Sequence, residues 1–518
     1  MKKLILILSL LFIASNAFAY GAFYSYPETT GGEPYRWKNG KTLWKYDIGR
    51  FSKKVPVEPE ASHVEFCKSA TVDPCGSEMI KCGILKCVEK KFKEWSDAKM
   101  LAGTSPTKEV KVANLSFIKI GPMSHDVESS VLDSDRNIYQ EYDKGTVKNP
   151  MTHIIFDEDG SILQDIYGEG NKPPLGLTLL FKDAKSPYYT GGMVILNGLA
   201  FDGETGGDVK ELASAKYVSG TILHELGHLI GLDHTQPLRD ILGASETSAP
   251  NKPNFVPTMY PSNIDEEQAS LKNDDKSGVA YIYWDEGTTQ EFKDGFCRIE
   301  GEVKNASTGE SYQGVNVVAY TDGDNIKESE KYGGQISFVS GSMYYPDVKD
   351  VPLGKYVIVG RMGGVPTKVV MQAIMSKWAG SSESGFAGSI NPYGVGENSD
   401  DWLDGPSEAL FAKDGNTVVS EGGKTCVICD LVKDGSPKSS DAYSAYQDAC
   451  EIKEVSLMTM RATDAPAPAE SKEQEENSSD SPKKGFCMSL AAPYNPAWGA
   501  VLPVLVGLLF ATRRRLQK

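Results

Sequence analysis

The stretch TILHELGHLIGLDH, residues 221–234, decides how this chain is interpreted, because it gathers three of the protein's six histidines. On a helix, His224 and His228 lie four residues apart and therefore project from the same face. Gly231 can adopt a positive φ at little cost, so the helix can stop there and the chain can turn back. That return would bring His234 beside the first two histidines.

Three neutral imidazoles in this arrangement suit one zinc ion. Three protein ligands leave the fourth tetrahedral position open for water, which is typical of catalytic rather than structural zinc sites. Glu225 is placed to reach a metal-bound water rather than the metal. The alternative is a helix whose buried histidines each find a separate hydrogen-bond partner. The sequence therefore predicts zinc on the three histidines, with Glu225 as the catalytic base.

Other motifs along the chain support this prediction through a resemblance to a family. HELGHLIGLDH resembles the motif of the metzincin metalloproteases, and the following Thr235 is similar to the matrixin branch. VPTMYPS (256–262) resembles the family's Met-turn, with Met259 as the methionine beneath the metal. SLKNDDKSGVAYIY (270–283) is similar to the helix that closes matrixin domains, and YRWKNGKTLWKY (35–46) to their opening strand. The resemblance implies a zinc endopeptidase that acts on proteins or peptides.

The chain also departs from that family. No cysteine-switch propeptide precedes the opening strand, and the family's structural zinc lacks its ligands, because the other histidines are widely spaced: His63, His125 and His153. The turn Asp157-Glu158-Asp159-Gly160 could hold calcium, although an acidic turn explains the same residues. Residues 129–149 form a polar insertion without an assigned role.

The pattern of residues 20–287 predicts an α+β catalytic domain, with a twisted mixed sheet plus helices. CVEKKFKEWSDAKM (87–100) has apolar residues at helical spacing and predicts an amphipathic helix. Strands are expected at 112–118, 153–156 and 192–196, and further helices from about Ala213 and at about 274–283.

Residues 296–455 change character and predict an all-β sandwich. Short alternating runs, separated by Gly, Asp and Pro, occur at 299–303, 314–320, 336–339 and 355–360. These runs loosely resemble the carboxypeptidase-regulatory-like β-sandwich. Modules of that kind act as spacers or as binding platforms, and both roles remain open here.

The first residues and the cysteines point to export. MKKLILILSLLFIASNAFA (1–19) has the basic start, apolar core and small-residue end of a secretory signal peptide. An oxidising compartment would favour disulfides over metal-bound thiolates. Two groups of four cysteines could each close two disulfides, with three pairings open in each group: Cys67, Cys75, Cys82 and Cys87, then Cys297, Cys426, Cys429 and Cys450.

The last part of the chain predicts attachment to a cell envelope. Residues 462–484 are rich in Pro, Ala, Ser and Glu, and a disordered linker is predicted over residues 456–484. Residues 485–518 hold Cys487, an apolar stretch and an arginine cluster, and resemble the sorting tails called MYXO-CTERM. That resemblance implies attachment near Cys487; a plain transmembrane anchor is the alternative.

The net charge of −16 argues against nucleic acid as a partner, because phosphate binding needs a basic face. The leading hypothesis is an exported, surface-attached zinc endopeptidase that acts as a monomer. The alternative is a surface adhesion or binding protein whose metzincin domain is inactive.

Overall fold

The computed structural model describes most of residues 33–340 and short strands beyond them. The described ranges are 33–101, 108–128, 151–167, 173–182, 186–202, 215–242, 250–261, 265–284, 287–293, 296–305, 315–321, 327–340, 355–361, 367–373, 408–411, 418–419, 425–426, 455–460 and 487–491. The expected signal peptide, the polar insertion, Cys429, Cys450, and most of the expected linker and tail lie outside these residues. No helix within the described ranges has the length and apolar character needed to cross a membrane.

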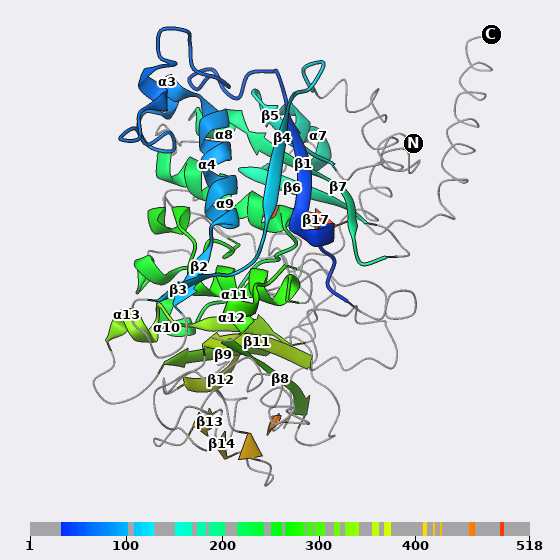
Figure 1. The fold of residues 1–518 in the computed structure, drawn as a ribbon, viewed down its shortest axis with the longest axis vertical. Coiled ribbons are helices and arrows are strands. Elements are labelled where there is room, and N and C mark those ends of the chain that lie inside the picture. The colour runs from blue at the N-terminus through cyan, green and yellow to red at the C-terminus, as the bar shows by residue number, and fades with distance from the viewer. Residues whose placement is uncertain are drawn as a thin grey trace, which may run out of the picture.

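A six-stranded mixed sheet forms one part of the molecule, in the order β17-β6-β7-β5-β1-β4 (Figure 1). Its strands are β1 (Lys41–Tyr46), β4 (Ser116–Pro122), β5 (Met151–Asp157), β6 (Gly176–Lys182), β7 (Tyr189–Asn197) and β17 (Cys487–Ala491). Strands β4, β1, β5 and β7 run parallel to one another, whereas β6 is antiparallel to β7. The chain is a mixed α+β protein, as predicted.

Two helices, α4 (Ile84–Ser96) and α9 (Ala215–Leu229), pack against each other, and α9 also lies against β6 and β7. The indole Nε1 of Trp95 donates a hydrogen bond of 2.9 Å to the carbonyl of Leu223 and joins the two helices. Helix α4 begins and ends earlier than the expected 87–100. It starts after Gly83, which has a φ of +78°, and residues 99–101 form strand β2 instead.

The end of α9 is held by aromatic side chains. The last carbonyls of a helix have no partner within the helix and need one elsewhere. Here Trp37 Nε1 donates to the Leu229 carbonyl at 2.7 Å, and the Tyr283 hydroxyl donates to the Ile230 carbonyl at 3.0 Å. Gly231 then has a φ of +104°, which confirms the predicted turn.

Shorter elements complete this part of the chain. They are α3 (Met79–Cys82), α7 (Ser161–Tyr167), α8 (Gly198–Phe201), α10 (Arg239–Leu242), α11 (Asn273–Ile282), α12 (Gln290–Lys293), β2 (Lys99–Leu101), β3 (Glu109–Lys111), and the 3-10 turns η1 (Lys38–Gly40), η2 (Phe66–Lys68), η3 (Pro253–Phe255) and η4 (Glu266–Ala269). The strand expected at 112–118 lies four residues later, as β4. The backbone N–H groups of Val112 and Asn114 instead donate to Ala98 and Gly287.

The first group of cysteines forms two disulfides, Cys67–Cys82 and Cys75–Cys87. This is one of the three pairings that the sequence leaves open. Cys82 and Cys87 lie at α3 and in α4, so both bonds fasten the segment before α4 to the helices. In the second group, Cys297 lies in β8 and Cys426 in β15.

The chain after Phe296 forms two further sheets, ordered β10-β9-β12-β13-β14-β15 and β11-β8-β16. Their elements are β8 (Phe296–Asn305), β9 (Val315–Thr321), α13 (Glu328–Lys331), β10 (Ile336–Val339), β11 (Lys355–Arg361), β12 (Thr367–Ala373), β13 (Glu408–Phe411), β14 (Val418–Val419), β15 (Thr425–Cys426) and β16 (Val455–Met460). Strand β16 extends five residues past the expected boundary at 455, because its backbone pairs with β8. Residues 456–460 are therefore strand rather than disordered linker.

The second part of the chain shares a hydrophobic core with the first. Helix α11 contacts β10 and β11, and Figure 1 shows it between the large sheet and these strands. Buried residues of both parts, such as Tyr281 and Phe338, belong to one cluster, and these two rings meet edge to face at 6.0 Å. The β strands after Phe296 are therefore packed directly beneath the segment that follows the histidine helix.

Candidate metal centre

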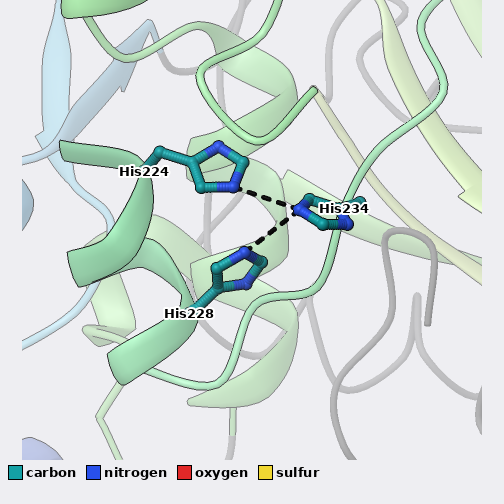
Figure 2. A group of neighbouring side chains, drawn as sticks. All are labelled: His224, His228 and His234. Carbon is teal, nitrogen blue, oxygen red and sulfur yellow. Dashed lines mark hydrogen bonds between the residues drawn. The ribbon is translucent and has the colours of Figure 1, made fainter. Parts of the chain in front are cut away.

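The three predicted histidines lie together in the interior. His224 and His228 project from one face of α9, and His234 faces them from the segment after the Gly231 turn (Figure 2). The Nε2 atom of His234 is 3.1 Å from that of His224 and 3.2 Å from that of His228. All three side chains are buried. This group could hold a metal ion, and no other such group of His, Cys, Asp or Glu occurs within the described ranges.

In His224 and His228, the hydrogen bond made by Nδ1 determines whether Nε2 carries a proton or a lone pair. His224 Nδ1 is 2.7 Å from the Thr258 carbonyl, and His228 Nδ1 is 2.8 Å from the Leu232 carbonyl. A carbonyl only accepts hydrogen bonds, so each Nδ1 carries the proton and each Nε2 presents a lone pair. Both Nε2 atoms lie close to His234 Nε2, and the ligand atoms of the three rings are all within 4.8 Å of one another. The donor set therefore fits a metal ion.

Burial keeps these imidazoles in the neutral form that metals require. It lowers the pKa of His224 to about 4, although the hydrogen bond to Thr258 opposes the shift. Burial, followed by the two neighbouring histidines, lowers the pKa of His228 well below its ordinary value. Near neutral pH no proton needs to be displaced from these two rings before a metal binds.

The acidic turn at 157–160 serves a structural purpose in the fold. The two carboxylate oxygens of Asp157 accept hydrogen bonds from the backbone N–H groups of Ile162 (3.1 Å) and Leu163 (3.0 Å), in the first turn of α7. Burial raises the pKa of Asp157 to about 6. The acidic turn thus has a helix-capping explanation, and calcium binding there stays a prediction.

His153 lies in β5, apart from the metal centre, and is expected to act as a pH sensor of stability. Burial, followed by the charge of Lys45, lowers its pKa to about 4 from 6.5. A group with a lowered pKa stabilises the fold above the unfolded value, and this contribution is lost as the pH falls from 6.5 towards 4. Between pH 7 and pH 4 the wild type should lose up to about 3 kcal/mol of unfolding free energy relative to His153→Gln.

Urea unfolding of both proteins across that pH range, with chelator present, measures this difference. His125→Gln, the same substitution at an exposed histidine, provides the control. A constant difference between the wild type and His153→Gln would contradict the prediction.

Met259 lies beneath the histidine helix, fully buried. A Cβ on Gly227, in the middle of HELGH, would be only 2.2 Å from the Met259 Sδ atom, so the glycine permits the close approach. The Met259 carbonyl accepts a hydrogen bond of 2.9 Å from the Thr235 N–H. The turn around Met259 therefore supports the helix from below and fixes the segment that carries the third histidine.

Glu225 lies between α9 and β6, beside the metal centre. The Thr178 hydroxyl, on β6, is 2.6 Å from Glu225 Oε2 and 3.0 Å from the Glu225 carbonyl. A Cβ on Gly176 would be 2.7 Å from Glu225 Cγ, so β6 approaches the carboxylate closely. Strand β6 was not predicted from the sequence. Its apolar run LTLLF (177–181) could have indicated a strand, but nothing local links Thr178 to Glu225.

Two adjacent aspartates at the start of α11 connect the site to its surroundings. Asp275 accepts hydrogen bonds from the backbone N–H groups of Thr258 (3.1 Å) and Met259 (2.9 Å). Asp274 accepts from the Thr235 hydroxyl and from Ser337 in β10. Burial raises the pKa of Asp274 to about 7 even though these hydrogen bonds oppose the shift. The predicted closing helix is therefore tied to both the Met259 turn and the third histidine's neighbour.

Cys487 lies in β17, at the outer edge of the large sheet. Its backbone pairs with Gly176 of β6, and β17 runs parallel to that strand and also contacts α9. This places Cys487 beside β6, the strand whose Thr178 hydroxyl donates a hydrogen bond to Glu225. Attachment of the chain through this cysteine stays a prediction.

Comparison with known proteins finds no match among protein-family models, curated proteins or solved structures. The site's function therefore has to be argued from its own residues.

Proposed function

We propose that the chain is a zinc-dependent endopeptidase of the metzincin type, similar to matrixins. The observation that carries the proposal is the convergence of three buried imidazoles next to a buried glutamate, with His234 Nε2 lying 3.1 and 3.2 Å from the Nε2 atoms of His224 and His228. Three nitrogen ligands are the donor set of catalytic zinc. The Met259 turn beneath the helix agrees with the family resemblance of the sequence.

The chain's own residues would divide the work of hydrolysis as follows. A bound zinc ion would lower the pKa of a water molecule and polarise the substrate carbonyl. Glu225 takes a proton from the attacking water onto a carboxylate oxygen and passes it to the leaving amine. Thr178 holds Oε2 of that carboxylate at 2.6 Å and so orients it. The carbonyls of Thr258 and Leu232 keep the two helical imidazoles in the ligand tautomer.

We further propose that the protein is exported and held at a cell envelope, where it cleaves proteins or peptides as a monomer. The two disulfides support an oxidising compartment, because such bonds persist outside the reducing cytosol. The sequence of residues 1–19 supports export, and that of 485–518 supports attachment.

Metal analysis combined with a cleavage assay tests the proposed function. The purified protein should contain about one zinc ion per chain, because the described residues offer one suitable ligand group. It should cleave an unstructured protein, lose this activity in a strong chelator, and regain it when zinc is added back. Sequencing the products would show the substrate preference. Absence of zinc together with absence of chelator-sensitive cleavage would instead favour a surface binding protein.

A further inference from the structure

The third histidine is positioned differently from the other two. His224 and His228 are fixed relative to each other by the repeat of α9. His234 lies five residues beyond the helix end at Leu229, in a segment that forms isolated β-bridges at Leu232 and His234 but belongs to no helix or strand. Contacts from elsewhere in the chain must therefore hold its ring opposite the other two.

Three such contacts converge on Thr235, the residue directly after His234. Its backbone N–H donates to the Met259 carbonyl, as described above. Its hydroxyl donates to Asp274 and is 2.7 Å from the Ser337 hydroxyl in β10. Thr235, Asp274 and Ser337 are all fully buried. No water competes for these hydrogen bonds, so they restrict the segment strongly.

Ser337 in turn is locked onto Asp274. Its backbone N–H lies 2.6 Å from Asp274 Oδ1, and its hydroxyl lies 3.2 and 3.1 Å from the two carboxylate oxygens. The hydroxyl contact therefore joins a residue adjacent to the metal centre to a strand that lies about 100 residues later in the chain.

The same β sheet also forms hydrogen bonds with the residues after Thr235. Gln335, next to β10, accepts a hydrogen bond of 2.7 Å from the Leu238 N–H. Asn316 in β9 donates one of 2.9 Å to the Gln236 carbonyl. Both side chains are 2% exposed. Residues 235–238 are thus bound along their length by side chains of the second part of the chain.

We propose that the sheet containing β9 and β10 is a working part of the metal centre, in which Ser337 positions His234 through Thr235. This role differs from both a spacer and a binding platform: the sheet packs against the segment of His234 and sets the position of this third ligand. The proposal rests on the metal site of the proposed function. Ser337 and Thr235 are positioning residues, since neither has to touch the metal or the substrate.

Four single variants and one double variant of the full chain test the proposal with Co²⁺ as a spectroscopic probe for the metal. Thr235→Val and Ser337→Ala each remove one hydroxyl; Thr235→Ser keeps it; Glu328→Gln alters an exposed ion pair with Lys252 across the same interface. Each hydroxyl deletion should weaken Co²⁺ and zinc affinity about 10- to 100-fold, as is typical of outer partners of metal ligands. Each should also change the visible Co²⁺ spectrum, which reports ligand geometry.

The double variant Thr235→Val/Ser337→Ala should lose less affinity than the two single losses added, because both act through one contact. Thr235→Ser and Glu328→Gln should keep wild-type affinity and spectrum. The positioning role would be overturned if Thr235→Val and Ser337→Ala were less stable than the wild type but kept its Co²⁺ spectrum and its metal affinity. A wild type that binds neither Co²⁺ nor zinc would overturn the proposed function itself. If Thr235→Val does not fold, Ser337→Ala alone decides the outcome.

Discussion

Glu225→Gln is expected to retain zinc while peptide hydrolysis falls by about 10²- to 10⁴-fold or more, because the amide cannot accept the water's proton. Glutamine has nearly the same shape as glutamate, and its carbonyl oxygen can still accept the hydrogen bond from Thr178. The three histidines and their outer partners are untouched by this change. Zinc content and kcat/KM on an unstructured protein substrate measure the two effects separately.

Glu266→Gln is the matched control, because that glutamate is exposed at the surface, where it pairs with Lys216. It should keep both zinc and turnover. Undiminished turnover in Glu225→Gln would contradict the assignment of this residue as the base. Loss of zinc in Glu225→Gln would instead show that the glutamate is needed to build the metal site.

Removal of the two disulfides is expected to cause the largest loss of stability. Each bond closes a short loop, with sequence separations of 15 for Cys67–Cys82 and 12 for Cys75–Cys87. A loop of that length contributes about 3 kcal/mol by constraining the unfolded chain. The loops overlap, so replacing all four cysteines by alanine should lower the free energy of unfolding by about 3 to 6 kcal/mol.

Urea unfolding in excess chelator measures this loss without a contribution from bound metal. A reductant should destabilise the wild type more than the four-alanine variant, which lacks these two bonds. An unfolding free energy that is equal in the variant and the wild type would contradict the prediction. Because Trp95 of α4 is bonded to Leu223 of α9, loosening this region should also weaken metal retention.

Much of the site follows from local rules and was predictable. The four-residue spacing of His224 and His228 puts both rings on one face of any helix that contains them. A glycine at 231 allows the reversal with a positive φ, and the structure has that conformation. The helix at 273–282 and the central strands β5 and β7 also lie where the periodicity indicates, with boundaries that shift by one to three residues at most ends.

Other features needed the folded chain, because they depend on residues that are distant in sequence. Thr178 reaches Glu225 across 47 residues, and the disulfide pairing was one of three that the cysteine pattern allows. The sequence pattern after Phe296 predicted a separate module, yet the strands that form there pack their apolar faces into the core around α11. Helix and turn preferences act over a few residues and contain no information about such contacts.

By itself, therefore, the sequence determined the residues of the site: three imidazoles, one glutamate and the glycine at which the chain turns, all within eleven residues. The tertiary structure decided how firmly that set is held. Thr258 and Leu232 fix the ring tautomers, and Ser337 reaches the segment of His234 from more than 100 residues away. The physical reason is that residue spacing on a helix follows its repeat, whereas the position of a ligand beyond the helix end depends on what packs against it.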